Sequence, residues 1–156
     1  MLSGLKEVEA GLNKAIAEIK ETSLKGLIRA AIVIRDDMEH TPPKIPVDLG
    51  NLRASCYIAA SGKGAVESGS NFTGKDASRL SSDHSQSVSS ATAETASDKN
   101  PSVIIGFSAY YAVYVHEMPD TNNFNRAGSG PKFLEDAIKR NEQRILSIIA
   151  EEAKIP

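Results

Sequence analysis

Apolar residues recur at spacings of three and four over the first forty positions, which predicts a long N-terminal helix. One stripe holds Leu5, Val8, Leu12, Ile16 and Ile19, and a second holds Leu24, Leu27, Ala31, Ile34 and Met38. The second stripe begins five positions after the end of the first, and Gly26 lies just beyond this step, where glycine weakens a helix by roughly 1 kcal/mol relative to alanine. We therefore predict helix from about Gly4 to Glu39, with a kink or a break near 22–26.

This predicted helix is longer than a small domain needs. About 35 helical residues span about 50 Å at 1.5 Å per residue, which exceeds the core of a domain of 156 residues. We expect part of the helix to pack on a neighbouring subunit. The prolines of segment 41–46 end it, because proline cannot donate to the helical ladder and restricts the residue before it.

Short apolar runs after the prolines predict strands and one turn. Segment 47–53 reads as a tight turn or a single helical turn with Asp48 as its N-cap. Segment 54–60 reads as a short strand, and segment 101–107 is a β-branched run typical of a strand.

Helical spacing returns near the C-terminus. Tyr110, Val113 and Tyr114 predict a short helix capped by Ser108, and Pro131 is expected to start a last helix that runs to about Ala153. Its predicted buried face holds Phe133, Leu134, Ala137, Ile138, Asn141, Ile145, Ile148 and Ile149.

The segment from Ser61 to Asn100 differs from the rest of the chain. It is rich in Ser, Thr, Gly, Ala and Asp, and no Leu, Ile or aromatic residue occurs from Ser81 onward within it. Such a composition buries too little apolar surface to offset the entropy of ordering. We predict a single domain over 1–156 with a flexible Ser-rich insertion at 61–100. The alternative is a polar hairpin around 62–69, anchored by Val66 and Phe72.

Composition and charge remove several classes of function. Apolar residues make up 40% and charged residues 24%, as in ordinary globular proteins. The net charge of −2 argues against a dedicated nucleic-acid binder. The single cysteine, Cys56, allows no intrachain disulfide, and we expect it to serve packing. No secretory signal and no stretch of about 18 apolar residues is present, so no membrane partner is expected.

The chain offers no recognisable catalytic constellation. His116-Glu117 begins like a zinc-protease motif, but position 120 is Asp where the second histidine would stand. No Gly-x-Ser-x-Gly elbow and no phosphate-binding loop occurs. We therefore expect no enzyme, no metal and no cofactor. A remote alternative is a metal-dependent phage enzyme that uses His84, His116 and Glu117.

Three motifs in order resemble one family. Segment 46–55 resembles "P-V-D-T-G-N-L-R-x-S", segment 105–117 resembles "V-G-x-x-x-x-Y-A-x-Y-V-H-E", and segment 131–137 resembles "x-x-F-L-x-x-A". These elements are those of the gene-ten-like tail-completion proteins (neck, or head–tail connector, proteins) of lambdoid and related bacteriophages. Leu49 replaces the family's small polar turn residue, and segment 61–100 is unusually long.

The resemblance implies a fold class and a role in the virion. It implies an α+β fold with a long N-terminal helix, a small antiparallel sheet and a C-terminal helix. The function implied is a structural subunit of the ring that joins the DNA-filled head to the tail, assembled in the host cytoplasm. Six-fold symmetry is favoured over twelve-fold. The expected partners are further copies, head-closure or adaptor proteins above, and tail-terminator or tail-tube proteins below, with non-specific contact to genomic DNA in the lumen as a further expectation. The alternative is another neck layer, a tail terminator or a head-closure protein.

The motifs also nominate residues for structure and assembly. These are Asp48, Gly50, Asn51, Leu52, Arg53, Gly106, Tyr110, Tyr114, His116, Glu117, Phe133 and Leu134. Gly50 and Asn51 tolerate positive φ and suit a sharp turn. We expect Arg53 to pair with Glu117, against the alternative that both are exposed and contribute under ~1 kcal/mol. The tyrosines suit an interface, and a core role for at least one is an equal alternative.

Overall fold

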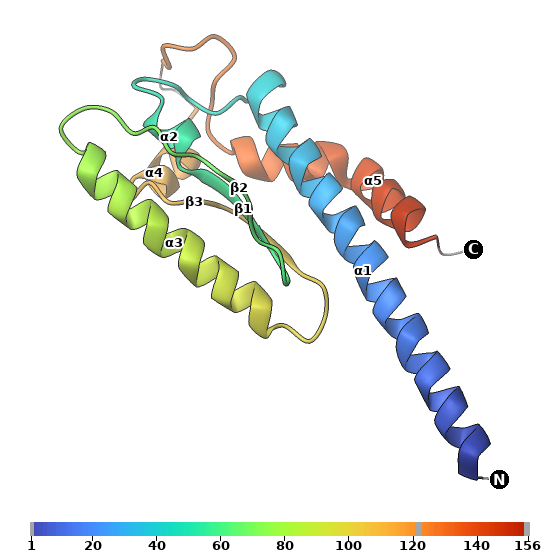
Figure 1. The fold of residues 1–156 in the computed structure, drawn as a ribbon. Coiled ribbons are helices and arrows are strands. Elements are labelled where there is room, and N and C mark those ends of the chain that lie inside the picture. The colour runs from blue at the N-terminus through green and yellow to red at the C-terminus, as the bar shows by residue number, and fades with distance from the viewer. Residues whose placement is uncertain (1, 121–122, 155–156) are drawn as a thin grey trace.

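A small sheet lies between one helix on its first face and a pair of long helices on its second (Figure 1). The computed structural model describes residues 2–120 and 123–154. Within these ranges the elements are α1 Leu2–His40, α2 Asn51–Ala54, β1 Cys56–Ala60, β2 Gly64–Ser68, α3 Ala77–Ser97, β3 Val103–Phe107, α4 Ala112–Glu117 and α5 Phe133–Ala153. The predicted α+β class is confirmed, with the long N-terminal helix, the antiparallel sheet and the C-terminal helix in place.

The sheet is antiparallel with the strand order β2-β1-β3. β1 and β2 form a hairpin in which Ala60 pairs with Gly64, and β1 pairs with β3 so that Ile58 opposes Ile105. The central strand is the most buried, since Ile58, Ala59 and Ala60 have no exposed surface. Both predicted strands, near 54–60 and 101–107, are therefore confirmed.

α1 is one continuous helix from Leu2 to His40, so the predicted break near 22–26 is wrong. Thr22 stays helical and its hydroxyl donates back to the carbonyl of Glu18 at 3.0 Å. Gly26 marks a close approach of two helices, because a Cβ on it would lie 2.9 Å from the Cα of Ile149 on α5. The step between the two apolar stripes thus reflects a change of surroundings along one helix.

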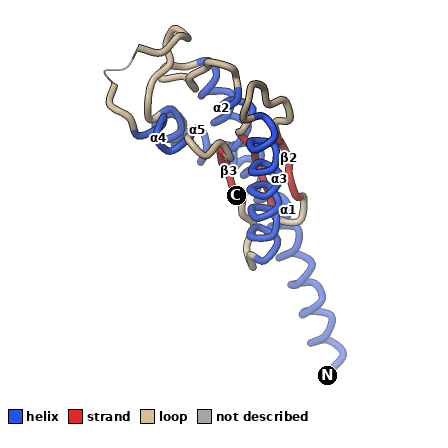
Figure 2. Tube along the Cα trace, turned by 90° about the vertical axis from the view of Figure 1, so that its left-hand side faces the viewer, coloured by secondary structure: helices blue, strands red, loops and turns tan. Residues whose placement is uncertain are grey.

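The two stripes of α1 have different fates. Leu24, Ala31, Ile34 and Met38 are buried in the domain. The first stripe is exposed: Leu5 by 67%, Val8 by 69%, Leu12 by 60%, Ile16 by 43% and Ile19 by 55%. Figures 1 and 2 show why, since the N-terminal half of α1 extends past the sheet and past the end of α5. Packing of this half on another subunit stays a prediction.

Much of the Ser-rich segment is ordered, which corrects the expectation of a flexible insertion over its whole length. It contains β2, as the hairpin alternative expected, and then the 21-residue helix α3. The buried residues of α3 are Leu80, His84, Ala91 and Thr95 at helical spacing. The hydroxyl of Thr95 donates to the carbonyl of Ala91 at 3.0 Å, so its burial leaves no unpaired donor. Small and polar residues therefore form the face that covers the sheet.

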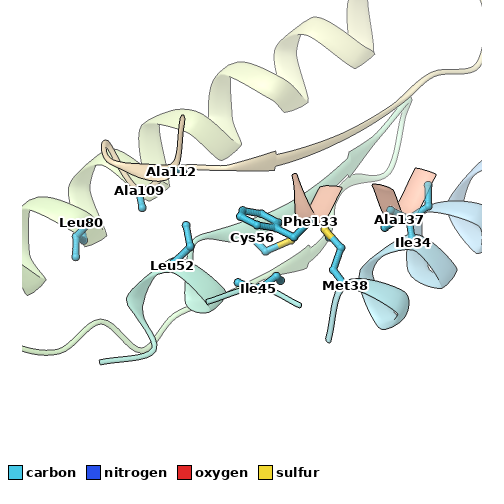
Figure 3. Close-up of a cluster of buried hydrophobic side chains, with 10 residues drawn as sticks. All are labelled: Ile34, Met38, Ile45, Leu52, Cys56, Leu80, Ala109, Ala112, Phe133 and Ala137. Carbon is cyan, nitrogen blue, oxygen red and sulfur yellow. The ribbon is translucent and has the colours of Figure 1, made fainter. Parts of the chain in front are cut away.

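The core lies where α1, the sheet, α4 and the start of α5 meet (Figure 3). Its buried cluster is Ile34, Met38, Ile45, Leu52, Cys56, Leu80, Ala109, Ala112, Phe133 and Ala137. α5 begins at Phe133, two residues after the predicted start at Pro131, because Lys132 before it adopts a left-handed backbone with φ 59°. The predicted buried face of α5 is confirmed at Phe133, Ala137, Asn141 and Ile148, whereas Ile138 is 43% exposed.

We predict that Cys56 does not react with a thiol reagent in the folded protein. The side chain has no exposed surface, and burial is the main cause that raises its pKa from 9.0 to about 12. At neutral pH the thiolate that attacks disulfides is then almost absent. Ellman's reagent should report no free thiol in buffer. It should report one thiol per chain in about 6 M guanidinium, which unfolds nearly all domains. Rapid labelling in buffer would contradict this placement.

Candidate assembly site

The three motif segments, far apart in sequence, meet around the short helix α4. Two hollows lie against this helix. The first is about 460 Å³ and is lined by residues 46–52, Asp76, Leu80, Tyr111, Val115 and residues 123–125. The second is about 200 Å³, mostly apolar, and is lined by Gly106, Phe107, Ala112, Val113, His116, Glu117, Phe133 and Leu134. α4 forms a wall of both, so its motif links the turn motif on one side to the start of α5 on the other.

The turn motif is held by the backbone of Gly50 and the side chain of Asn51. Gly50 has φ 85°, a left-handed conformation that glycine adopts without strain, and it precedes α2. Asn51 is buried, and its amide makes two hydrogen bonds of 2.9 Å with the backbone N–H and C=O of Thr73. Leu52 points into the core. Asp48 is exposed at the first hollow and does not cap α2, which corrects its predicted role.

Arg53 pairs with Glu39 and not with Glu117, so the predicted ion pair is wrong. Its Nε lies 3.1 Å from Glu39 Oε2. Arg126 joins the same carboxylate at 3.2 Å and also donates to the carbonyls of Glu39 and Ile45. The end of α1, the turn motif and the loop before α5 are thereby tied to one carboxylate. This three-way junction could not be read from spacing, because its members are distant in sequence.

Glu117, at the end of α4, is bound to Lys132 and His116. Its carboxylate accepts hydrogen bonds from Lys132 and, at 2.6 Å, lies against Nδ1 of His116. The hydrogen bond from Lys132 is the main cause that holds the pKa of Glu117 below its ordinary value. The His116 ring also stacks edge-on against Phe133, with centroids 4.9 Å apart. His116 and Glu117 therefore fasten α4 to the start of α5.

The three tyrosines of the second motif divide their roles. Tyr110 is 46% and Tyr114 75% exposed, whereas Tyr111 is half-buried. The guanidinium of Arg79 on α3 lies 3.9 Å from the centroid of the Tyr110 ring. Burial, followed by the nearby Tyr110, Asp48 and Asp76, raises the pKa of Tyr111. One tyrosine thus packs inward, as the core alternative expects for at least one of them, and an interface role for the two exposed tyrosines stays a prediction.

Gly106 is required by its cross-strand neighbour. Gly106 pairs with Tyr57 in the register of β1 and β3, and the Tyr57 ring lies over it, so that any Cβ would collide with the ring. Phe133 is almost wholly buried, with its ring 5.4 Å from that of Phe107, and Leu134 is half-buried at the edge of the second hollow. Gly106, Phe133 and Leu134 therefore form part of the wall of the second hollow.

His84 lies at the centre of a buried hydrogen-bond network that the sequence did not predict. His84 on α3 lies 2.7 Å from the hydroxyl of Ser68 on β2 and 2.7 Å from that of Ser108 after β3. Ser108 also donates to the carbonyl of Ser55, so it serves this network and does not cap α4, which Tyr111 precedes. The network joins α3 to both edges of the sheet. Only tertiary structure brings these residues together, and no spacing in the sequence signals it.

We predict that His84 makes the free energy of unfolding fall as the pH drops below 6.5, the ordinary pKa of histidine. Burial lowers the pKa of His84 from 6.5, so the unfolded chain takes up a proton that the folded chain binds only at lower pH. This contribution to the free energy of unfolding is complete above pH 6.5 and is lost as the pH falls through the lowered value. In urea unfolding measured at a series of pH values, the midpoint should fall as the pH falls below 6.5.

The control for this prediction is Gln86, an exposed and non-titrating residue on the same helix. His84→Gln should flatten the pH dependence of the urea midpoint, whereas Gln86→Ala should leave that dependence unchanged. The acidic groups Glu117 and Glu135, whose pKa values are lowered, act below pH 4.5 and do not interfere. Equal slopes for all three proteins would refute the assignment to His84.

The side chains that the metal-dependent alternative would use are not grouped as metal ligands in the described parts of the chain. Within 2–120 and 123–154, no three His, Cys, Asp or Glu side chains are grouped so as to hold a metal ion, and His84 bonds to serines while His116 bonds to Glu117. No described helix is long and apolar enough to span a membrane. Searches with family models, among curated proteins and among solved structures found no match to the chain.

Proposed function

We propose that this protein is a structural subunit of the neck ring of a tailed bacteriophage, a tail-completion protein that joins the DNA-filled head to the tail. The observation that carries the proposal is the convergence of three separate motif segments around α4. The turn motif lines one hollow beside this helix, and the start of α5 lines the other. Motifs that resemble one family in order and also lie around one helix support that family's role better than three unconnected resemblances would.

The exposed surface suits contact with protein. Val113 and Tyr114 on α4 are 69% and 75% exposed, and the N-terminal half of α1 carries a row of exposed aliphatic side chains. Contiguous exposed apolar surface on a soluble domain marks an interaction site. Aromatic residues are also enriched where proteins meet. A subunit held between other proteins in a virion needs protein-binding surfaces on several sides at once.

In this proposal each copy contacts its neighbours in the ring, a head-closure or adaptor protein above and a tail-terminator or tail-tube protein below. Six-fold symmetry is favoured, with twelve-fold symmetry as the alternative. Contact with the genome in the lumen would be weak and non-specific, because the 18 Lys and Arg residues nearly balance the 20 Asp and Glu residues and such contact weakens with salt. Placement in another neck layer, as a tail terminator or head-closure protein, is the alternative within the same class.

Inactivation of the gene in its phage tests the proposal. Lysates of the mutant should contain DNA-filled heads and separate tails, and a plasmid copy of the wild-type gene should restore joined particles. Electron microscopy of the lysate reads both results. The matched control is a plasmid copy with Leu146→Ala, an exposed position on α5 away from the motifs, which should also restore joining. Normal infectious particles without the protein would refute the proposed role.

A further inference from the structure

The described surface carries two concentrations of exposed apolar residues, and they lie at opposite ends of the molecule. One is the apolar stripe of α1, formed by Leu5, Val8, Leu12, Ile16 and Ile19. The other is the α4 patch, formed by Tyr110, Val113 and Tyr114. Figures 1 and 2 both show the N-terminal end of α1 far from α4. The stripe of a molecule therefore cannot reach its own α4 patch.

From this arrangement we infer that the stripe of one copy docks on the α4 patch of the next copy, head to tail. A contact between two different surfaces of the same chain is heterologous, and repeated contacts of this type close into a ring when the rotation permits. As an account of the ring contact, the inference rests on the proposed neck function. The surfaces that carry it are independent of that function.

The length of helix beyond the body of the domain provides room for a partner. Every described side chain from Gly4 to Glu21 on α1 is exposed. Lys20 marks where the body begins, because its Nζ donates to the carbonyl of Lys99 at 2.9 Å. The sixteen residues 4–19 extend about 24 Å at 1.5 Å per residue, which is enough for several turns of contact. An exposed apolar row of this length on an isolated helix lacks the packing that stabilises helices in proteins.

One flank of the stripe is lined by small residues. Gly4, Gly11 and Ala15 each lie three or four positions from a stripe residue, so they border it along one side. A Cβ on Gly4 or Gly11 would meet nothing within 4 Å, so neither glycine is required by packing inside the chain. Glycine also destabilises a helix interior relative to alanine. If a partner approaches this flank closely, the absence of side chains at Gly4 and Gly11 makes room for it.

The α4 patch has the complementary shape and charge. Its tyrosine rings are large and rigid, and the exposed rings can lie against the shallow surface that Gly4, Gly11 and Ala15 leave. Arg79 stacks over Tyr110 at the edge of the patch, and although its Nε lies 3.6 Å from Asp83, its side chain is 60% exposed and can also meet an acidic partner. The opposite flank of the stripe carries Glu9, which borders Leu5 and Leu12 at helical spacing. Val113 also forms the rim of the apolar second hollow, so the patch continues into a depression.

The full chain, purified and studied by sedimentation velocity over a concentration series, tests this contact. Wild-type protein should self-associate. Leu12→Glu on the stripe and Tyr114→Asp on the patch should each raise the dissociation constant at least tenfold, about what loss of a contact residue at the centre of an interface produces. Leu146→Glu, at another exposed apolar position, is the matched control and should associate as the wild type does. Circular dichroism should be the same for all four proteins.

Mixing the two weakened variants decides between head-to-tail and symmetric pairing. Leu12→Glu keeps an intact patch and Tyr114→Asp keeps an intact stripe, so an equimolar mixture should form a one-to-one heterodimer that grows no further. If two stripes pair with each other, Tyr114→Asp alone would associate like the wild type and the mixture would give no heterodimer, which overturns the inference. Wild-type protein that stays monomeric up to about millimolar, the weak limit of specific binding, would overturn it as well.

These results separate the inference from the proposed function. The contact is measured on purified protein, without any virion. A head-to-tail contact in a protein that is absent from phage particles would therefore support the inferred contact and refute the neck role. A protein found in the neck with no head-to-tail contact in the mixture would keep the role and remove the inference.

Discussion

Phe133→Ala should destabilise the protein by about 3–5 kcal/mol, a large part of the 5–15 kcal/mol typical of a domain. The ring is 1% exposed at the first residue of α5 and lies edge-on to both Phe107 and His116. Its loss leaves a cavity where the sheet, α4 and α5 meet, and the ring also anchors the His116 side of α4. Urea unfolding followed by circular dichroism measures the change.

Leu146→Ala is the matched control for this prediction, because it removes a large apolar side chain from the same helix. Leu146 is 56% exposed, so the change should stay within about 0.5 kcal/mol. Equal losses for the two variants would mean that Phe133 does not occupy the core position described. A small loss at Phe133 alone would mean that the cavity closes or that water replaces the ring.

Gly26→Ala should destabilise the protein by about 1–3 kcal/mol, although alanine favours helix over glycine by about 1 kcal/mol. The two effects oppose each other, and the structure decides the sign. The new Cβ would lie 2.9 Å from the Cα of Ile149, and backbone cannot move aside as a flexible side chain can. α5 must then shift along α1, which disturbs the pairs Arg29–Glu152 and Arg140–Asp37 on either side.

The sign of this change is the test. Lys25→Ala, at the exposed neighbouring position, is the control and should change the free energy of unfolding by less than about 0.5 kcal/mol. A stabilising Gly26→Ala, as helix propensity alone predicts, would contradict the close approach of α1 and α5. Denaturant unfolding of the three proteins side by side gives the answer.

Strong periodicity was enough to predict α1, β1, β3 and α5. The error at Gly26 has a physical reason, because a glycine that weakens an isolated helix looks the same in sequence as one that admits a neighbouring helix. Spacing shows which residues share a face, but it does not show whether that face is covered. The exposed stripe and the buried stripe of α1 are therefore equivalent in sequence and different in structure.

α3 was missed because its buried face lacks large aliphatic residues. After Leu80 the residues that pack on the sheet are His84, Ala91 and Thr95, which supply little apolar area and satisfy their polar groups locally or across the sheet. Serines on its other faces are poor helix formers and favour turns in isolation. Tertiary packing on the sheet supplies what the sequence of this segment lacks.

The motif segments lie together around α4, but the hydrogen bonds and ion pairs of their residues could not be predicted from the sequence. The turn at Gly50 follows from local rules and is confirmed, whereas Leu52, named only as a structural or assembly candidate, lies in the core. Arg53 was assigned the wrong carboxylate, because Glu39 at the end of α1 and Glu117 at the end of α4 are equally plausible partners until the fold places them. Long-range ion pairs depend on how helices end relative to one another, which one sequence does not specify.

The central claim is that this chain forms part of the neck, and cryo-electron microscopy of the neck of purified virions tests it most directly. The account predicts a ring between the portal end of the head and the tail in which each subunit has α1 projecting from a three-stranded sheet covered by α3, with α5 packed against α1. Virions in which no neck layer has this fold, and from which mass spectrometry recovers no peptide of this chain, would contradict it.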